Sequence, residues 1–262
     1  MFLLAILAAC NDNTLVVDGA EAGVGTDSAG TDEALDATWD NARLVIEAPL
    51  SGAFLPMEEE SAFTAVVMGS DGTVLDFPGI TWSSDVDIDW ALTGAAAIDG
   101  QLGVGIHAIT AEALLPNGDR LAYTVGGVLK QSVYAGVYVG ALSVTADVDY
   151  GGTPISVGCS GALTMIVDAM GETATGDAGC LLSLLGYDID TVYDFALDND
   201  AGALSGEAAI DLSFYSLPVA TEGTLTEAGE LEGTFGADVA GYVTLDANYT
   251  ATRITRDLST VE

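Results

Sequence analysis

Gly105-Ile-His-Ala-Ile-Thr-Ala-Glu-Ala113 and Arg120-Leu-Ala-Tyr-Thr-Val125 are the two runs that decide the fold class, and Pro116-Asn-Gly-Asp119 separates them. Apolar and polar residues alternate along both runs, which is the period of a β-strand with one buried face. Gly supplies positive φ in the intervening segment, and Asn and Asp tolerate it. The stretch therefore predicts a β-hairpin.

Similar runs precede this hairpin in the chain. They span Arg43–Glu47, Ser61–Met68 and Gly79–Trp82, with a turn former at Ser70-Asp-Gly72. Strands at this spacing, with a turn signal about every ten residues, indicate a β-sandwich. We therefore expect a sandwich over residues 41–131.

The second half of the chain, residues 132–262, has the same alternation without helical periods. About eight strands are predicted, over Val133–Tyr150, Ile155–Val167, Thr173–Leu181, Ile189–Leu197, Ala203–Phe214, Ala220–Thr226, Leu231–Val239 and Tyr242–Ile254. Eight antiparallel strands can close into an up-and-down barrel, which removes exposed sheet edges, or form a Greek-key sandwich. The predicted fold class is all-β, with an antiparallel barrel or sandwich following the first sandwich.

Two sequence patterns resemble known β families. Ile80-Thr-Trp-Ser-Ser-Asp85 followed by Gly105-Ile-His-Ala-Ile-Thr-Ala111 resembles the bacterial immunoglobulin-like domains of surface proteins. The resemblance implies that Trp82 is buried between two sheets and that the domain is a spacer, stalk or adhesion module. Tyr134-Ala-Gly-Val-Tyr138 and Tyr249-Thr-Ala-Thr-Arg253 resemble the ends of lipocalin and avidin-type barrels, where a late Arg packs on an early aromatic residue; Tyr138 replaces the usual Trp.

The charge balance excludes one large class of partners. The chain has 5 Lys and Arg residues against 40 Asp and Glu residues, which gives a net charge of −35. Binding to nucleic acid requires cationic clusters that neutralise phosphates, so no nucleic-acid partner is expected. An acidic surface favours solubility in salt, or the binding of divalent cations.

The N-terminus carries an export signal. Residues 1–9 are apolar, too short to span a bilayer, and of the length of a signal-peptide core. Leu7-Ala8-Ala9-Cys10 resembles the lipobox of bacterial lipoproteins, which implies lipidation of Cys10 and a membrane partner through that lipid. The positively charged segment usual before the apolar run is missing. In Gram-negative lipoproteins an Asp directly after the cysteine retains the protein at the inner membrane, so Asn11 favours the outer membrane or cell surface.

The residues that follow the lipobox predict a tether. Eight acidic residues, no basic ones and repeated Gly, Ser and Thr lie between Asn11 and Asp40. Such a composition cannot bury enough apolar surface to fold. We therefore expect a signal peptide at residues 1–9 and a lipidated, disordered acidic tether at residues 10–40.

Cysteine usage agrees with an exported protein. Three cysteines are an odd number, and assigning Cys10 to lipid leaves Cys159 and Cys180. These two can pair in an oxidising compartment. A zinc site is not expected from two distant cysteines without nearby histidines.

The sequence contains none of the catalytic motifs that can be identified by residue spacing. His107 is the only histidine, and its strand position favours a packing role; no nucleophile elbow or phosphate loop occurs. Asp85-Val-Asp-Ile-Asp89 would place three carboxylates on one face if it were a strand, although a solvated loop or strand edge is favoured. Asp198-Asn-Asp200 begins like a calcium loop but lacks the distal Glu, so a hairpin turn is the simpler interpretation. Asp85, Asp87, Asp89, Asp198 and Asp200 are therefore the only calcium candidates, and no other cofactor is expected.

These observations favour a non-enzymatic, surface-tethered lipoprotein with a structural, adhesion or binding role. The alternative is a binding protein whose C-terminal barrel encloses a small apolar ligand. A hydrolase that uses a pair of carboxylates is the weaker alternative, because 40 acidic residues make adjacent pairs common by chance. The partner, a protein or a small apolar molecule, is not identified by any residue.

Overall fold

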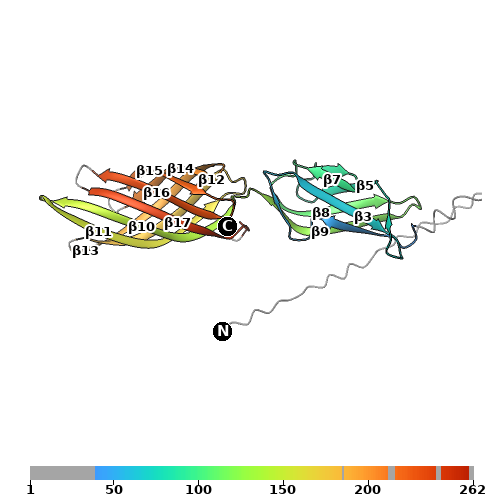
Figure 1. Ribbon diagram of the computed structural model, residues 1–262, viewed down its shortest axis with the longest axis horizontal. Coiled ribbons are helices and arrows are strands. Elements are labelled where there is room, and N and C mark those ends of the chain that lie inside the picture. Colours follow the sequence, from blue (N-terminus) through green and yellow to red (C-terminus); the bar gives the residue numbers. More distant parts are fainter. Residues whose placement is uncertain (1–38, 185, 212–215, 240–242, 260–262) are drawn as a thin grey trace, which may run out of the picture.

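The computed structural model describes residues 39–184, 186–211, 216–239 and 243–259. This part of the chain is all-β, as predicted, and has two separate hydrophobic clusters. Figure 1 shows the two units end to end, with β1–β9 in one and the closed barrel of β10–β17 in the other. None of the described residues belongs to a helix with the length and apolar character needed to span a membrane.

The first unit, here called the sandwich, consists of two sheets that enclose one hydrophobic cluster. One sheet contains β1 (Arg43–Ala48), β3 (Ser61–Met68), β4 (Val74–Leu75) and β7 (Ala96–Asp99). The other sheet is ordered β2 (Phe54–Pro56), β9 (Arg120–Gln131), β8 (Gly105–Leu114), β5 (Ile80–Ser84) and β6 (Ala91–Thr93). The predicted hairpin forms from β8 and β9. Every second residue of β3 is buried, which is the alternation expected of a strand with one face on a core.

Trp82 lies at the centre of this core, where the immunoglobulin-like pattern places it. Its side chain is 1% exposed and contacts Phe63 edge to face, with ring centroids 5.7 Å apart. The indole N–H donates to the Gly94 carbonyl oxygen at 2.9 Å, so burial leaves no polar atom of this side chain unsatisfied. All three tryptophans of the chain belong to residues 39–90, so tryptophan fluorescence reports on the sandwich alone.

The second unit is a closed barrel, so the barrel prediction holds and the Greek-key alternative does not. Each strand pairs antiparallel with the next, and the last strand pairs with the first to close the sheet. The strands are β10 (Gly136–Tyr150), β11 (Thr153–Val167), β12 (Thr173–Leu184), β13 (Tyr187–Asp200), β14 (Ala203–Asp211), β15 (Ser216–Leu225), β16 (Glu230–Val239) and β17 (Val243–Thr255). The eight predicted strands match these within a few residues at their ends.

Aromatic and aliphatic side chains fill the middle of the barrel. Tyr193, Phe195, Phe235 and Tyr249 form a chain of ring contacts with centroids 5.2 to 6.1 Å apart. All four are at most 5% exposed. The alternation of inward apolar and outward polar residues thus produces a packed interior in this region.

The late arginine packs on the early aromatic residue, as the barrel resemblance implies. The guanidinium carbon of Arg253 lies 5.9 Å from the centroid of the Tyr138 ring. Arg253 also donates to the Val133 and Glu227 carbonyl oxygens. Gly136 makes room for this packing, because a Cβ atom there would lie 2.6 Å from the Arg253 side chain. Burial raises the pKa of the Tyr138 hydroxyl, and Arg253 opposes that rise.

Removal of the hydroxyl group is expected to change the stability of the barrel in opposite directions at two buried tyrosines. The Tyr249 hydroxyl lies 3.2 Å from the Thr221 hydroxyl, whereas the Tyr193 hydroxyl has no well-aligned hydrogen bond among the described residues. Burial raises the pKa of both, and the nearby Thr191 hydroxyl partly opposes the rise at Tyr193. Burying a polar group without a hydrogen bond costs free energy.

We therefore expect Tyr193→Phe to stabilise the barrel by about 1 kcal/mol and Tyr249→Phe to destabilise it by about 1 kcal/mol. Urea unfolding followed by the near-ultraviolet circular dichroism of tyrosine measures both effects. The two variants remove the same atom from the same kind of interior, so each is the control for the other. Equal losses of stability in both would contradict the assignment of Tyr193 as unsatisfied.

Candidate functional site

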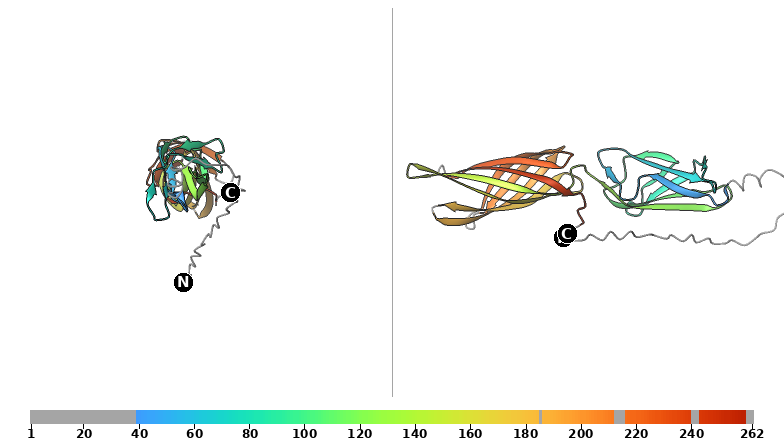
Figure 2. Two further views of the ribbon diagram at one scale, coloured as in Figure 1. Left: turned by 90° about the vertical axis from the view of Figure 1, so that its right-hand side faces the viewer. Right: turned by 60° about the horizontal axis from the view of Figure 1, so that its bottom comes forward.

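The barrel has two ends that differ in what they contact. Because the strands alternate in direction, the chain enters at β10 and leaves at β17 on the same end, called the base. The base faces the sandwich in Figures 1 and 2. The opposite end, called the distal end, carries the connections β10–β11, β12–β13, β14–β15 and β16–β17. The described residues of the distal end therefore lie away from the sandwich.

Specific contacts join the base to the sandwich. The Glu58 carboxylate accepts hydrogen bonds from the Ser132 hydroxyl at 2.5 Å and from the Val133 N–H at 3.1 Å. Gln131 donates its side-chain amide to the Arg256 carbonyl oxygen at 2.9 Å. The Arg256 guanidinium carbon lies 4.1 Å from the centroid of the Phe54 ring. These contacts fix the direction in which the barrel leaves the sandwich.

The sandwich end that receives the N-terminal segment lies away from the barrel. Lys130, near the end of β9, bonds to Ser61 at the start of β3, so both lie next to the base. β1 begins at Arg43, which pairs with Met68 at the other end of β3. β1 therefore begins at the end of the sandwich opposite the barrel (Figure 1).

The few cations of the chain are absent from the barrel wall. Arg43 and Arg120 lie at the far end of the sandwich, and Arg253 and Arg256 lie at the base. No Lys, Arg or His occurs between Lys130 and Arg253, whereas Asp and Glu recur along every one of the strands β10–β17 except β11. The wall and distal end of the barrel thus carry carboxylates without a cation to balance them.

Lys130 is not a surface cation either. It is 1% exposed, and its ammonium donates to the carbonyl oxygens of Pro56 and Glu59, at 2.7 and 3.2 Å. A further bond reaches the Ser61 hydroxyl at 3.2 Å. Burial lowers the pKa of Lys130, and the carboxylates of Asp99, Glu58 and Glu59 oppose that change. Its role is to connect β2, β3 and β9 next to the base.

The wall of the barrel is incomplete between β11 and β12. Their ladder runs only from Leu163↔Ala178 to Val167↔Ala174, next to the base. Beyond it, β11 continues to Thr153 and remains paired with β10 on its other side only. We call the gap bordered by Thr153–Gly158 of β11 and Leu181–Leu184 of β12 the distal seam. It leaves two strand edges without ladder partners among the described residues.

The apolar face of β11 becomes accessible along this seam. Leu163, Met165 and Val167, next to the base, are 0% exposed. Ile155 and Val157, on the same inward face but at the distal seam, are only partly buried. Val148, an inward residue at the same end of β10, is partly buried although β10 is paired on both sides, so the change reflects the open end of the barrel. The distal end of the barrel therefore offers apolar surface together with unpaired backbone groups.

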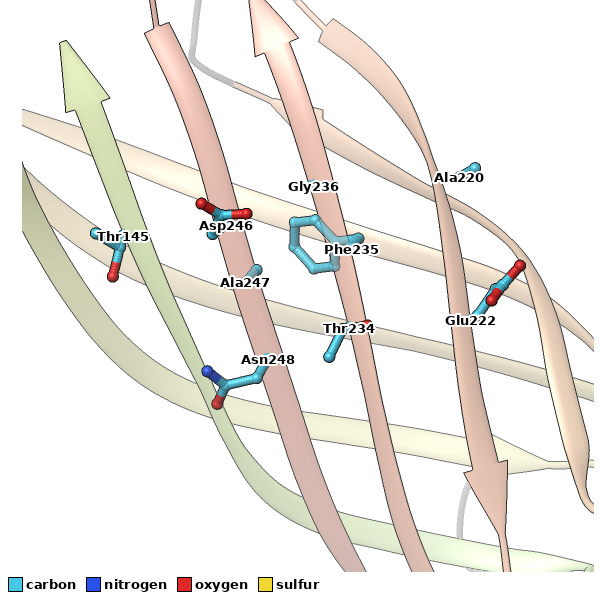
Figure 3. A pocket seen from close by; sticks show the side chains of 9 residues that line it. All are labelled: Thr145, Ala220, Glu222, Thr234, Phe235, Gly236, Asp246, Ala247 and Asn248. Atoms are coloured by element: carbon cyan, nitrogen blue, oxygen red, sulfur yellow. The ribbon is translucent and has the colours of Figure 1, made fainter.

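A second opening lies between β15 and β16. Their ladder covers only Thr221–Leu225 and Leu231–Phe235. A hollow of about 530 Å³ opens on the outer side here, and Figure 3 shows the residues that line it. They are Thr145, Ala220, Glu222, Thr234, Phe235, Gly236, Asp246, Ala247 and Asn248. Of the three apolar side chains that line the hollow, Phe235 and Ala247 belong to the barrel core and Ala220 is exposed.

This hollow bears on the carboxylate-pair hydrolase hypothesis. Glu222 on β15 and Asp246 on β17 line the same hollow, and both are exposed to solvent. A carboxylic acid that donates a proton near neutral pH needs a buried, apolar environment to hold that proton. The surroundings of these two residues do not provide it.

The predicted disulfide is present. Cys159 and Cys180 are bonded, with Cα atoms 5.7 Å apart. The bond crosses between β11 and β12 at the point where their ladder has already ended, next to the distal seam. Cys10, the proposed lipidation site, lies outside the described residues, as do the signal peptide and almost all of the proposed tether.

The calcium candidates are placed in two separate regions. β5 ends at Ser84, so the arrangement of Asp85, Asp87 and Asp89 on one strand face is wrong, and the favoured loop is present. Asp85 accepts from the Ala108 N–H and Asp87 from the Gly103 N–H, bonds that hold the loop. The described residues contain no group of three or more potential ligands arranged for a metal ion.

Asp198 and Asp200 lie at the end of β13, next to the turn into β14. Ala201 and Gly202 have positive φ there, in agreement with the hairpin-turn interpretation. Calcium binding at these residues and at the 85–89 loop stays a prediction, which calorimetric titration with calcium tests.

His107 has a structural environment. It is 1% exposed, with Nδ1 2.8 Å from the Ser84 hydroxyl and Nε2 2.9 Å from the Gly103 carbonyl oxygen. Since a carbonyl only accepts, Nε2 donates its proton to the Gly103 carbonyl oxygen, and Nδ1 lies within hydrogen-bond distance of the Ser84 hydroxyl. The Ser84 oxygen also accepts from the Val86 and Asp87 N–H groups. The pair thus holds the 85–89 loop, and burial keeps it from any substrate.

The distal seam was not anticipated from the sequence. Strand alternation predicts which residues point inward, but it does not report where one ladder ends and two strands separate. The sequence does show which turns share one end of the barrel, because every second turn of an up-and-down barrel falls at the same end. The Gly151-Gly152 turn and Tyr187, which is 76% exposed, therefore share one end of the barrel with Leu181, which is 50% exposed.

Comparisons with known proteins show no family. No protein-family model matches the chain, and no curated protein matches it. Among solved structures, intact Ap-TbpB with N and C lobes is 14% identical, with a TM-score of 0.30 over 74% of this chain and 51% of that one. A mutant of the vaccine antigen Transferrin Binding Protein B from Haemophilus parasuis is 13% identical, with the same TM-score and coverage.

The ywiB protein from Bacillus subtilis is 14% identical, with a TM-score of 0.24 over 45% of this chain and 94% of that one. The chain spans about half the length of the two TbpB structures that it matches. At these identities and TM-scores the likenesses assign neither a family nor an activity to the chain.

Proposed function

We propose that this chain is a non-enzymatic, surface-tethered lipoprotein in which the sandwich is a spacer and the barrel is a binding head. The observation that carries the proposal is the order of the parts. β1 begins at Arg43, at the end of the sandwich opposite the barrel, and the distal end of the barrel lies farthest from that point (Figure 1). An anchor at the N-terminus would therefore present the distal end outward.

The sequence supplies the anchor in this proposal. Leu7-Ala8-Ala9-Cys10 matches the lipobox pattern, and the acidic residues up to Asp40 form the tether. Asn11 favours the outer membrane or cell surface. The immunoglobulin-like pattern around Trp82 fits a spacer, because its buried core and the contacts at the base keep the head at a fixed direction.

The packed barrel interior supports binding at the surface of the head. Small-molecule sites are commonly cavities of several hundred cubic ångströms that bury most of the ligand. Here the rings of Tyr193, Phe195, Phe235 and Tyr249 occupy the middle of the barrel. The geometry therefore favours an external partner over an enclosed apolar ligand.

Expression of the full chain in a Gram-negative host tests the anchoring. We expect the protein in the membrane fraction, with mass analysis showing residues 1–9 removed and fatty-acyl groups on Cys10. The matched control is Cys10→Ser, which should be released as soluble protein while keeping the tryptophan fluorescence of a folded sandwich. An unmodified Cys10 in the full chain, or equal membrane association of both proteins, would refute the lipoprotein proposal.

A further inference from the structure

We infer that the distal seam binds an extended segment of a partner protein in which apolar residues alternate with Lys or Arg. The inference rests on the proposed function, since it names the class of partner for the same binding head. The site consists of the free edge of β11 from Thr153 to Gly158, the half-buried side chains Ile155 and Val157, and the carboxylates beside them.

The free backbone edge of β11 explains why the partner segment should be extended. A strand edge presents alternating N–H and C=O groups, and another chain can satisfy them by adding as a strand. β11 is paired with β10 along its whole length, so its register and direction are already fixed on one side. The disulfide between Cys159 and Cys180 limits the open edge toward the base. Thr153–Gly158 therefore accommodates a segment of about six residues in extended conformation, with Pro154 supplying only its carbonyl oxygen.

The side chains around the seam explain why apolar and cationic residues should alternate in the partner segment. Successive residues of an added strand point to opposite faces of the sheet. Residues that point inward would contact Ile155 and Val157, which lack a complete apolar environment. Residues that point outward would lie beside Asp147 on β10, which pairs with Ser156 of β11, and Asp190 on β13, which pairs with Leu181 of β12. Both carboxylates are exposed.

The negative charge of the barrel favours a positively charged partner segment. No Lys, Arg or His lies between Lys130 and Arg253, so nothing on the wall near the seam neutralises Asp147 and Asp190. A cationic segment gains from this field, and an anionic one is repelled. The acidic N-terminal segment of this chain, with eight acidic and no basic residues between 11 and 40, is for that reason a poor occupant. A second copy of the barrel is disfavoured in the same way.

The test measures binding of synthetic peptides to the purified full-length protein in detergent. The probe is fluorescently labelled Lys-Val-Lys-Ile-Lys-Val-Arg-Ile, and fluorescence anisotropy gives its dissociation constant. One control peptide has the same composition in two blocks, with the cations first and the apolar residues after. A second control replaces every cation with Glu.

We expect the alternating peptide to bind at least about tenfold more tightly than the block peptide, and the acidic peptide not to bind. Affinity should fall severalfold when NaCl is raised from about 50 to about 200 mM, because the carboxylates are exposed to screening. Equal binding of the alternating and block peptides would mean attraction by net charge alone, and it would overturn the inference. Absence of binding would overturn it as well.

Matched variants locate the site. Asp147→Asn with Asp190→Asn removes two charges beside the seam, whereas Asp198→Asn with Glu207→Gln removes two charges elsewhere on the wall. We expect the first pair to weaken binding at least about fivefold and the second by less than about twofold. Equal effects of the two pairs would overturn the placement at the seam.

Amide hydrogen exchange distinguishes strand addition from binding by charge attraction alone. Binding of the alternating peptide should slow amide exchange at those residues of 155–158 whose N–H groups point away from β10, because the added strand accepts hydrogen bonds from that edge. Protection confined to other strands would overturn the inference. Lipidation of Cys10 is measured separately, so a failure of peptide binding with an acylated Cys10 rejects this partner class and leaves the proposed anchoring intact.

Discussion

Gly140→Ala is expected to destabilise the barrel by about 3 kcal/mol, at the upper end of what overpacking costs. Gly140 lies on β10 opposite Ala251 of β17, at the pairing that closes the barrel. A Cβ atom at this position would lie 1.9 Å from the Thr250 carbonyl oxygen and 2.5 Å from the Ala251 Cα. Both are backbone atoms of the partner strand, so the two strands must separate to admit the methyl group.

Urea unfolding with two optical probes checks this prediction. Near-ultraviolet circular dichroism of tyrosine reports mainly on the barrel, and tryptophan fluorescence reports on the sandwich. The matched control is Gly126→Ala on β9, because a Cβ atom there meets no atom within 4 Å. We expect the barrel transition to shift only in Gly140→Ala. A shift of less than about 0.5 kcal/mol would show that the strands adapt without loss of pairing.

Loss of the disulfide is expected to cost about 3 kcal/mol. Cys159 and Cys180 are 21 residues apart in sequence, and closing a loop of this size removes conformational entropy from the unfolded chain by that amount in the chain-entropy model. The double variant Cys159→Ala, Cys180→Ala should therefore unfold at lower urea concentration. The fold should persist, since the ladder from Leu163 to Val167 remains.

Reduction of the unmodified protein provides the control for the disulfide variant. Dithiothreitol should lower the stability of the natural chain to that of the double variant and should leave the double variant unchanged. Tryptophan fluorescence should show the same sandwich transition in all four samples. If the oxidised natural chain and the double variant unfold at the same urea concentration, the disulfide does not stabilise the barrel.

Much of this architecture was predictable from residue patterns. Alternation of apolar and polar residues identifies the eight barrel strands, because a strand with one buried face needs a period of two. The packing of Arg253 on Tyr138 followed from resemblance to other small barrels. The 85–89 segment illustrates a limit: Asp85-Val-Asp-Ile-Asp89 alternates like a strand, yet Ser84, His107 and backbone N–H groups hold it as a loop. Hydrogen bonds between distant residues override such a local pattern.

The distal seam was harder to predict for a related reason. Ile155 and Val157 have the same inward alternation as Leu163 and Met165, so the sequence does not distinguish the open part of β11 from the paired part. β11 and β12 stay adjacent as far as Cys159 and Cys180, whose Cα atoms are 5.7 Å apart, and where their regular pairing ends depends on the twist and register of the whole barrel. Cys159 and Cys180 were identified as a pair, but their position at the edge of an opening requires the three-dimensional structure.

The even number of strands has a consequence for how this protein can diversify. Both chain ends of the barrel lie at the base, so each of the four distal connections only links two neighbouring strands. One of them can lengthen or change composition without altering the junction at Glu58 and Ser132 or the path of the other three. An insertion at a distal connection should therefore leave the strand pairing and the base unchanged, which makes this end of the barrel suited to carrying a foreign epitope.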